Sequence, residues 1–204
     1  MKPRHLRPLL AGSLLPLLLT ALGGCLFEPR EPEAPETRSI AYLPRTLAEN
    51  VWENCRLALI NRDTGGWDTA IADNFVYEPD GNTLSAYPTV DWANWDKDAE
   101  MGFINSWFAT DVTIAADLLN GGDDDVTPAG SGGVAEWEVT YLITVTDNQT
   151  GSVTRYRGLC TLRFELQGSY WFLAFWRDEV GQEDPDNPGS TLETLGTVRG
   201  VFAP

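Results

Sequence analysis

The chain has 204 residues, of which 30 are acidic and 14 are basic, so its formal net charge at pH 7 is −16. A surface this acidic repels nucleic-acid phosphates, and we expect no nucleic-acid partner. The one histidine, His5, lies in a segment that we expect to be removed. Without it, Ser-His-Asp and Cys-His catalytic systems and most zinc sites are excluded. We expect neither a bound metal nor a cofactor.

Residues 1–24 have the pattern of an export signal. Three basic residues precede an apolar stretch, residues 9–21, that is shorter than the roughly 20 residues a membrane-spanning helix needs. The stretch "LGGC", which ends at Cys25, then resembles the bacterial lipobox. The resemblance implies cleavage before Cys25 and acylation of its thiol. An ordinary secretory signal peptide that carries a cysteine is the alternative.

Residues 25–44 are rich in proline and glutamate, which favours an extended tether over a packed element. The lipid on Cys25, and not a helix, would then be the contact with the membrane. This places the protein in the bacterial cell envelope. Because Leu26 rather than aspartate follows the cysteine, the resemblance implies the outer membrane if the host is Gram-negative. The mature chain would carry 11 basic and 30 acidic residues, a net charge of −19.

Residues 45–204 are long enough for one domain with one core. Its first half is predicted to be mainly helical, from apolar residues that recur at helical spacing. Thr46-Leu47-Ala48-Glu49 has the form of a capping box, and Asp96 is a suitable N-cap for a later helix. The elements predicted here are a helix over 47–62, a helix over 65–72, a strand over 74–81 and a helix over 97–108.

The second half is predicted to be a sheet, because apolar and polar residues alternate along it. The predicted strands run over 112–118, from 137 to 145, over 156–166 and over 170–180, with an acidic loop after the first and a tail after the last. A four-residue loop at 148–151 gives both apolar rows the same face and sets Glu136 opposite Arg163. The last strand is apolar on both faces, so we expect it to be central or covered.

This order of elements resembles the NTF2-like, or SnoaL-like, fold. The resemblance is carried by "NRDTGGWDTAIADNFVYEPD" (61–80), "WDKDAEMGFINSWF" (95–108) and "WFLAFWRDE" (171–179). It implies an α+β fold in which about three N-terminal helices pack on a curved antiparallel sheet around a cone-shaped cavity. Some proteins of this fold use the cavity as an active site and others only as core, so the fold does not give the function.

Two carboxylates are candidate catalytic residues. In the steroid-isomerase branch of the fold, an acidic base stands directly before the proline of the first-strand turn, and here Glu78 precedes Pro79. Asp178 follows a tryptophan on the closing strand and could point into the cavity. Burial would have to raise the pKa of either carboxyl for it to act as a base near neutral pH. A solvated turn acid and a structural hydrogen-bond acceptor are the respective alternatives.

Aromatic residues could line an apolar ligand pocket, since all eight tryptophans lie in the mature chain. Filling the core is the alternative role. The pocket-lining candidates are Trp52, Tyr77, Trp107, Trp137, Tyr141, Tyr156 and Trp176.

After acylation of Cys25, Cys55 and Cys160 are the only thiols left, in an exported and therefore oxidising setting. Both belong to predicted inward faces, so they could form a disulfide. Two free buried thiols are the alternative, because an inward cysteine is also a common small core residue.

The interpretation we favour is a membrane-anchored, non-enzymatic envelope lipoprotein whose domain binds a small apolar ligand or a protein partner. The alternative is a small-molecule isomerase or hydrolase that uses Glu78 and Asp178. A homodimer through the outer sheet face is a further expectation. The charged residues predicted on that face argue against a dry interface; they are Glu136, Glu138, Arg155, Arg157 and Arg163.

Overall fold

A computed structural model describes residues 40–118, 125–126 and 133–204, and Ile40–Pro204 form one unit. The predicted signal peptide, Cys25 and the tether up to residue 39 lie outside the described residues, as does most of the acidic loop. None of the helices in the described part is long and apolar enough to cross a membrane.

Three helices confirm the helical first half to within a few residues: α2 (Ala48–Asn61), α3 (Thr64–Ala70) and α5 (Lys97–Phe108). Three short elements were not predicted: α4 (Gly81–Ala86), the 3₁₀ helix η1 (Trp92–Asn94) and α6 (Gly196–Val201). The last of these lies in the segment predicted to be a tail. None of the three is long enough to show a helical repeat of apolar residues.

The two predicted helix caps have different outcomes. Asp96 caps α5 as predicted, because its carboxylate accepts a hydrogen bond from the Ala99 backbone N–H at 3.0 Å. The capping box at the start of α2 is wrong, since the N-cap is Leu47 and makes no side-chain hydrogen bond. Asn54 instead holds the chain before α2, bonding the N–H and C=O of Leu43 at 2.8 and 2.9 Å. A side chain two turns inside the helix therefore sets its approach.

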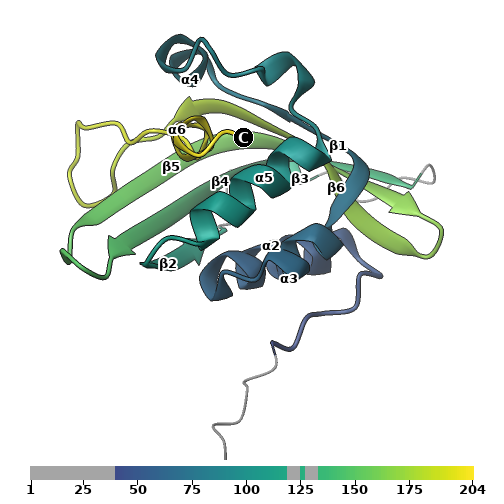
Figure 1. The fold of residues 1–204 in the computed structure, drawn as a ribbon. Helices are drawn as coiled ribbons and strands as arrows, with labels where there is room; N and C mark the ends of the chain where they lie inside the picture. The colour runs from purple at the N-terminus through teal and green to yellow at the C-terminus, as the bar shows by residue number, and fades with distance from the viewer. Residues whose placement is uncertain (1–39, 119–124, 127–132) are drawn as a thin grey trace, which may run out of the picture. The chain divides into compact units, whose positions relative to one another are not determined.

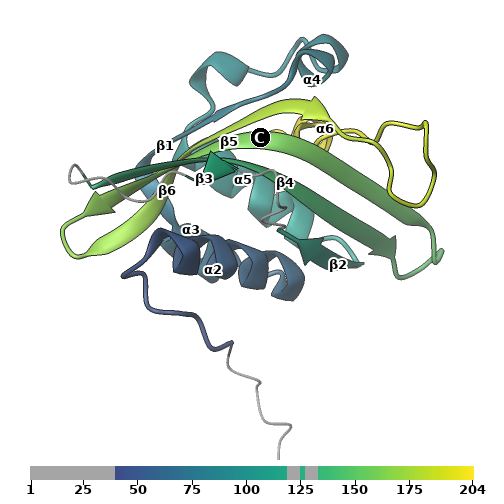
Figure 2. The same ribbon diagram turned by 180° about the vertical axis from the view of Figure 1, so that it is seen from behind.

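The sheet has the strand order β1-β6-β5-β4-β2, and β3 pairs with β4. Its strands are β1 (Ile71–Glu78), β2 (Val112–Asp117), β3 (Asp125–Val126), β4 (Val134–Asp147), β5 (Val153–Gln167) and β6 (Tyr170–Gly181). The pairings are antiparallel except that of β1 with β6, which is parallel, so the predicted antiparallel sheet is in detail a mixed one. Figures 1 and 2 show the sheet curving over α2, α3 and α5, which lie on one of its faces.

The register of the long hairpin agrees with the prediction. Glu136 of β4 lies opposite Arg163 of β5, and the two apolar rows share the face that the helices cover. Buried residues of this inner face alternate with less buried residues of the outer one, about half of which are charged. The strand pattern in the sequence therefore determined which side of the hairpin is inside.

A β-bulge in β6 changes which residues of that strand point inward. Leu173 pairs with Phe164 and Phe175 with Arg163, so Ala174 is an additional residue without a partner on β5. Before the bulge, odd-numbered residues such as Leu173 are inward; after it, Trp176 and Asp178 are. The bulge therefore turns Asp178 toward the interior and Arg177 toward solvent.

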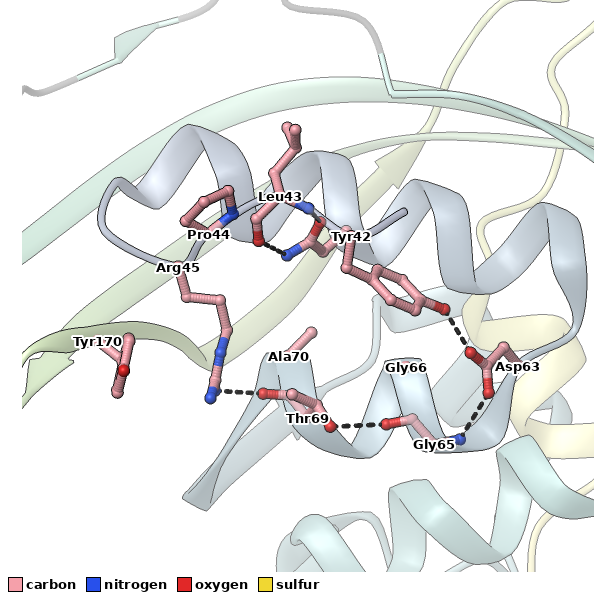
Figure 3. Close-up of a pocket in the computed structure, with 11 residues that line it drawn as sticks. Tyr42, Leu43, Pro44, Arg45, Asp63, Gly65, Gly66, Thr69, Ala70 and Tyr170 are labelled. Atoms are coloured by element: carbon pink, nitrogen blue, oxygen red, sulfur yellow. Dashed lines mark hydrogen bonds between the residues drawn. The ribbon is translucent and has the colours of Figure 1, made fainter. Parts of the chain in front are cut away.

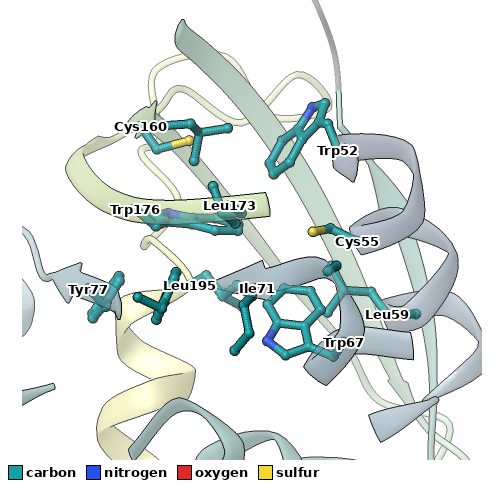
Figure 4. Packing of buried hydrophobic residues seen from close by; sticks show 14 of the residues in the cluster. Trp52, Cys55, Leu59, Trp67, Ile71, Tyr77, Cys160, Leu173, Trp176 and Leu195 are labelled. Carbon is teal, nitrogen blue, oxygen red and sulfur yellow. The ribbon is translucent and has the colours of Figure 1, made fainter. Parts of the chain in front are cut away.

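The interior between the sheet and the helices is filled by apolar side chains. Figure 4 shows Trp52, Cys55 and Leu59 of α2 facing Leu173 and Trp176 of β6. The Trp52 and Trp176 rings meet edge to face, with centroids 5.5 Å apart. Such pairs stabilise a core beyond the area that they bury.

Candidate functional site

The two candidate carboxylates lie on opposite faces of the sheet. Glu78 pairs with Arg177 in the β1–β6 register, its side chain is 52% exposed, and its carboxylate is 3.9 Å from the Arg177 guanidinium. Asp178 is 2% exposed and faces the interior. The structure therefore does not bring Glu78 and Asp178 together in one site.

Asp178 is held by four hydrogen-bond donors. The Tyr141 hydroxyl and the Trp176 indole N–H donate to Oδ1, both at 2.9 Å. The Tyr77 hydroxyl at 2.8 Å and the Gly196 backbone N–H at 3.1 Å donate to Oδ2. Burial raises the pKa of the Asp178 carboxyl above its usual value, against the opposing effects of Arg199 and the hydrogen bonds. A carboxylate that accepts four hydrogen bonds has little capacity left for a substrate.

Sequence reasoning missed a buried ion pair beside Asp178. Arg199 of α6 donates from Nε and Nη2 to the two carboxylate oxygens of Glu100 on α5, each at 2.9 Å, and both side chains are fully buried. Glu100 also accepts from the Trp95 indole N–H at 2.9 Å. Burial by itself lowers the pKa of Arg199. The Glu100 carboxylate and other neighbours raise it by more than this, so the pKa lies above its usual value. We call Glu100, Asp178 and Arg199 the charged cluster.

Two glycines let α6 approach closely enough to place Arg199. A Cβ on Gly196 would lie 2.6 Å from the Tyr77 hydroxyl, and one on Gly200 would lie 2.4 Å from the Tyr87 ring. The Leu195 backbone N–H also donates to the Tyr141 hydroxyl at 2.7 Å. The motif "LGTVRG" was the only signal in the sequence that could have pointed to this helix.

The aromatic pocket candidates divide into two groups. Trp107 and Tyr156 line a pocket of about 280 Å³ together with Val198 and Phe202. The other five pack in the buried core and line none of the four best-defined pockets of the described residues; they are Trp52, Tyr77, Trp137, Tyr141 and Trp176.

A larger pocket, of about 490 Å³, lies where the chain enters the domain. We call it the N-terminal pocket; it is lined by Tyr42, Leu43, Pro44, Arg45, Asn54, Asp63, Gly65, Gly66, Thr69, Ala70 and Tyr170 (Figure 3). The Tyr42 hydroxyl donates to Asp63 at 2.6 Å, and burial with this bond raises the pKa of Tyr42 above its usual value. Arg45 donates to the Thr69 carbonyl at 2.5 Å and lies 4.2 Å over the Phe172 ring.

Three residues of this pocket, Tyr42, Leu43 and Pro44, belong to the segment predicted to be tether, which the structure packs against the domain instead. The apolar run "IAYL" within that otherwise polar stretch is the signal that could have found them.

The candidate disulfide is not formed in the structure. Cys55 is a fully buried free thiol, so no bridge joins it to Cys160, and Figure 4 shows the two side chains on α2 and on the sheet. Burial raises the pKa of the Cys55 thiol, as does Glu100. In the described part of the chain, no three His, Cys, Asp or Glu side chains are grouped so as to hold a metal ion.

No family model and no curated protein matches the chain. A putative aromatic ring hydroxylase from Novosphingobium aromaticivorans matches with a TM-score of 0.53 and 12% identity, covering 76% of this chain and 95% of that one. An NTF2-like protein of unknown function from Rhodospirillum rubrum matches with a TM-score of 0.46 and 18% identity, covering 64% and 94%. The order of the elements and the helices packed on one face of the curved sheet confirm the predicted NTF2-like fold. At such identities the likeness concerns the fold alone.

In this NTF2-like domain, α6 fills part of the space between sheet and helices. Arg199 reaches Glu100, and Gly196 reaches Asp178. What the arrangement can do chemically is hold a cation inside the domain; it does not present a free carboxylate to a substrate.

Proposed function

We propose that this protein is a lipid-anchored lipoprotein of the bacterial cell envelope whose NTF2-like domain is a binding module and not an enzyme. The anchor is supported by the sequence of residues 1–25, where a basic start, a short apolar stretch and "LGGC" follow one another. If the host is Gram-negative, we place the anchor in the outer membrane, because Leu26 follows the cysteine.

The hydrogen bonds of Asp178 are the main support for a domain without enzymatic activity. A general base needs a lone pair within hydrogen-bond reach of the proton that it removes. Both oxygens of Asp178 already accept two hydrogen bonds each, from Tyr77, Tyr141, Trp176 and Gly196. Glu78, the other candidate, lies on the outer face beside Arg177. Neither carboxylate lines any of the four pockets.

We propose the N-terminal pocket as the site for a small apolar ligand. Its volume of about 490 Å³ is within the usual range for small-molecule sites. Leu43, Pro44, Ala70 and the ring of Tyr170 give it apolar walls, while Arg45 and Asp63 supply polar groups that could orient a ligand. Because residues 42–45 form one wall, a ligand there would contact the first residues of the described domain.

Mass spectrometry of the protein purified from its native membrane tests the anchor and reports any bound ligand. We expect a mature N-terminus at Cys25 with the added mass of acyl chains, and loss of that mass in Cys25→Ser. An N-terminus elsewhere, without lipid, would overturn the anchor.

Titration with a neutral apolar fluorophore such as N-phenyl-1-naphthylamine tests the pocket. Thr69→Trp adds a large ring to the pocket wall on α3 and should weaken binding at least tenfold. Leu84→Trp, on the exposed face of α4, is the matched control and should leave binding unchanged. Equal binding by both variants would rule out the N-terminal pocket as the site.

A further inference from the structure

The guanidinium of Arg199 lies in a cage of three aromatic rings from three different elements. Its Cζ atom is 4.0 Å from the ring centre of Tyr77 on β1, 4.8 Å from that of Trp176 on β6 and 5.3 Å from that of Phe103 on α5. All these distances are within the range for cation–π attraction, which is strongest where the cation has left water. Arg199 is fully buried.

Two carboxyl groups complete the cage. Glu100 receives the Nε and Nη2 donors as a planar fork, an arrangement that suits a guanidinium and not the point charge of an ammonium. Asp178 lies 4.0 Å from Nη1, which is buried and makes no hydrogen bond. The aromatic rings therefore contact the faces of the planar cation, and Glu100 contacts its edge. The Nη1 donor of Arg199 is left without a hydrogen bond.

The cage and its occupant come from different parts of the chain. The three rings and both carboxylates belong to β1, α5 and β6, whereas Arg199 lies on α6, a helix of six residues. Hollows of about 310, 560 and 280 Å³ adjoin this helix, lined in turn by Thr197, by Gly200 and by Val198. A short segment that is flanked by open space on several sides opens at lower cost than a packed strand does.

We propose that the cage is a binding site for a guanidinium group, that Arg199 is its resident occupant, and that an arginine-bearing segment of a partner protein exchanges with it. The acidic chain, with a net charge of −16, would attract such a basic segment. The inference rests on the domain being a binding module, but it requires neither the lipid anchor nor a ligand in the N-terminal pocket.

The first experiment tests whether the cage accepts a free guanidinium. Arg199→Ala removes the atoms that ethylguanidinium replaces, two carbons and the guanidinium itself. At ten times its dissociation constant, ethylguanidinium should raise the Tm of this variant by about 3–6 °C, or restore a cooperative melt if the variant is unfolded alone. Arg199→Met, which keeps the cage filled, should not respond. Ethylammonium, which lacks the planar fork, is the matched control ligand.

The second experiment tests exchange in the wild-type protein, with hydrogen exchange read at the Leu195 and Gly196 amides. These amides are bonded to Tyr141 and Asp178 while α6 is seated. The probe is the acetylated, amidated pentapeptide Thr-Val-Arg-Gly-Val, and the control is the same peptide with citrulline for arginine. Excess probe should accelerate exchange at both amides at least tenfold and leave β5 unchanged, while the citrulline peptide should have no effect.

The outcomes separate the claims. No response of Arg199→Ala to ethylguanidinium would overturn the site. A response there without accelerated exchange in the wild type would make Arg199 a fixed structural group and overturn the exchange. Either result leaves the fluorophore titration and the lipid mass unaffected, so failure of this inference is distinguishable from failure of the proposed function.

Discussion

Two regions on the same face of the sheet are equally buried but are held together differently. Near α2, the core consists of apolar side chains such as Trp52, Cys55 and Leu59, whose contacts are non-directional. Near α6, the charged cluster buries Glu100, Asp178 and Arg199, each at 2% exposure or less. The first region depends on filled volume, and the second depends on each charge keeping its partner.

This difference matters because a buried ion pair is weak evidence for stability. Apolar residues of similar volume in place of a buried ion pair often give the domain equal or greater stability. Loss of one partner of the pair, in contrast, leaves a buried charge without compensation. The contribution of the apolar side chains near α2 to stability is therefore enough to explain why they are buried. The charged cluster fits a role in recognition, in line with a cage that holds an exchangeable arginine.

The largest effect should come from Glu100→Gln. Removing this carboxylate leaves the buried Arg199 guanidinium without its bidentate partner and with only Asp178 at 4.0 Å, so we expect a loss of about 3–5 kcal/mol in the free energy of unfolding. The measurement is urea unfolding of Glu100→Gln, Arg199→Met and the double variant. The double variant should lose clearly less than the sum of the two single losses. Strict additivity would contradict the pairing.

Leu59→Ala probes the apolar region and should cost about 2–4 kcal/mol, because it leaves a cavity at a fully buried position. Combined with Arg199→Met, its effect should be additive to within about 0.5 kcal/mol, since Leu59 takes no part in the hydrogen bonds of the charged cluster. Strong coupling measured in the same urea series would show that the two regions are not independent.

Asp178→Asn should cost about 1–3 kcal/mol, because one of the two oxygens that accept four hydrogen bonds becomes a donor. The effect should also depend on pH. Burial raises the folded-state pKa of Asp178 above the ordinary value of 3.8, so the folded protein binds this proton more tightly than the unfolded chain. The contribution of Asp178 is therefore complete below 3.8 and is lost as the pH rises through the raised pKa.

Urea unfolding of wild type and Asp178→Asn between pH 3.5 and 7 measures that dependence. The stability advantage of the wild type should be widest at the acid end and should narrow as the pH rises. A gap that widens toward neutral pH would mean that the folded-state pKa is lowered and not raised.

The smallest effect concerns the thiols and involves no change in stability. Two thiols per chain, Cys55 and Cys160, should react with an alkylating reagent after denaturation without reductant, when Cys25 is acylated. In the native state Cys55 should be protected, because it is fully buried and its pKa is raised. A denatured, unreduced chain with no reactive thiol would establish the disulfide instead.

Local patterns determined much of the fold. The apolar spacing over 47–62 and 97–108 predicted two helices, and Asp96 predicted the start of the second. Alternation predicted the long strands, and the short hairpin loop predicted Glu136 opposite Arg163. These features could be predicted because each depends on residues close together in the chain, where a periodicity or a turn length leaves a direct trace.

The candidate site was decided by tertiary structure. Asp178 is inside because Ala174 forms a bulge, and the pattern of β6, apolar on both faces, cannot show where such a residue is inserted. Arg199 is inside because its carboxylate partner, 99 positions away in the chain, compensates a charge that would otherwise stay in water. Sequence by itself determined the elements and their inner faces. Only the folded chain could decide which charges those faces would bury, because the cost of burial depends on partners that meet only after folding.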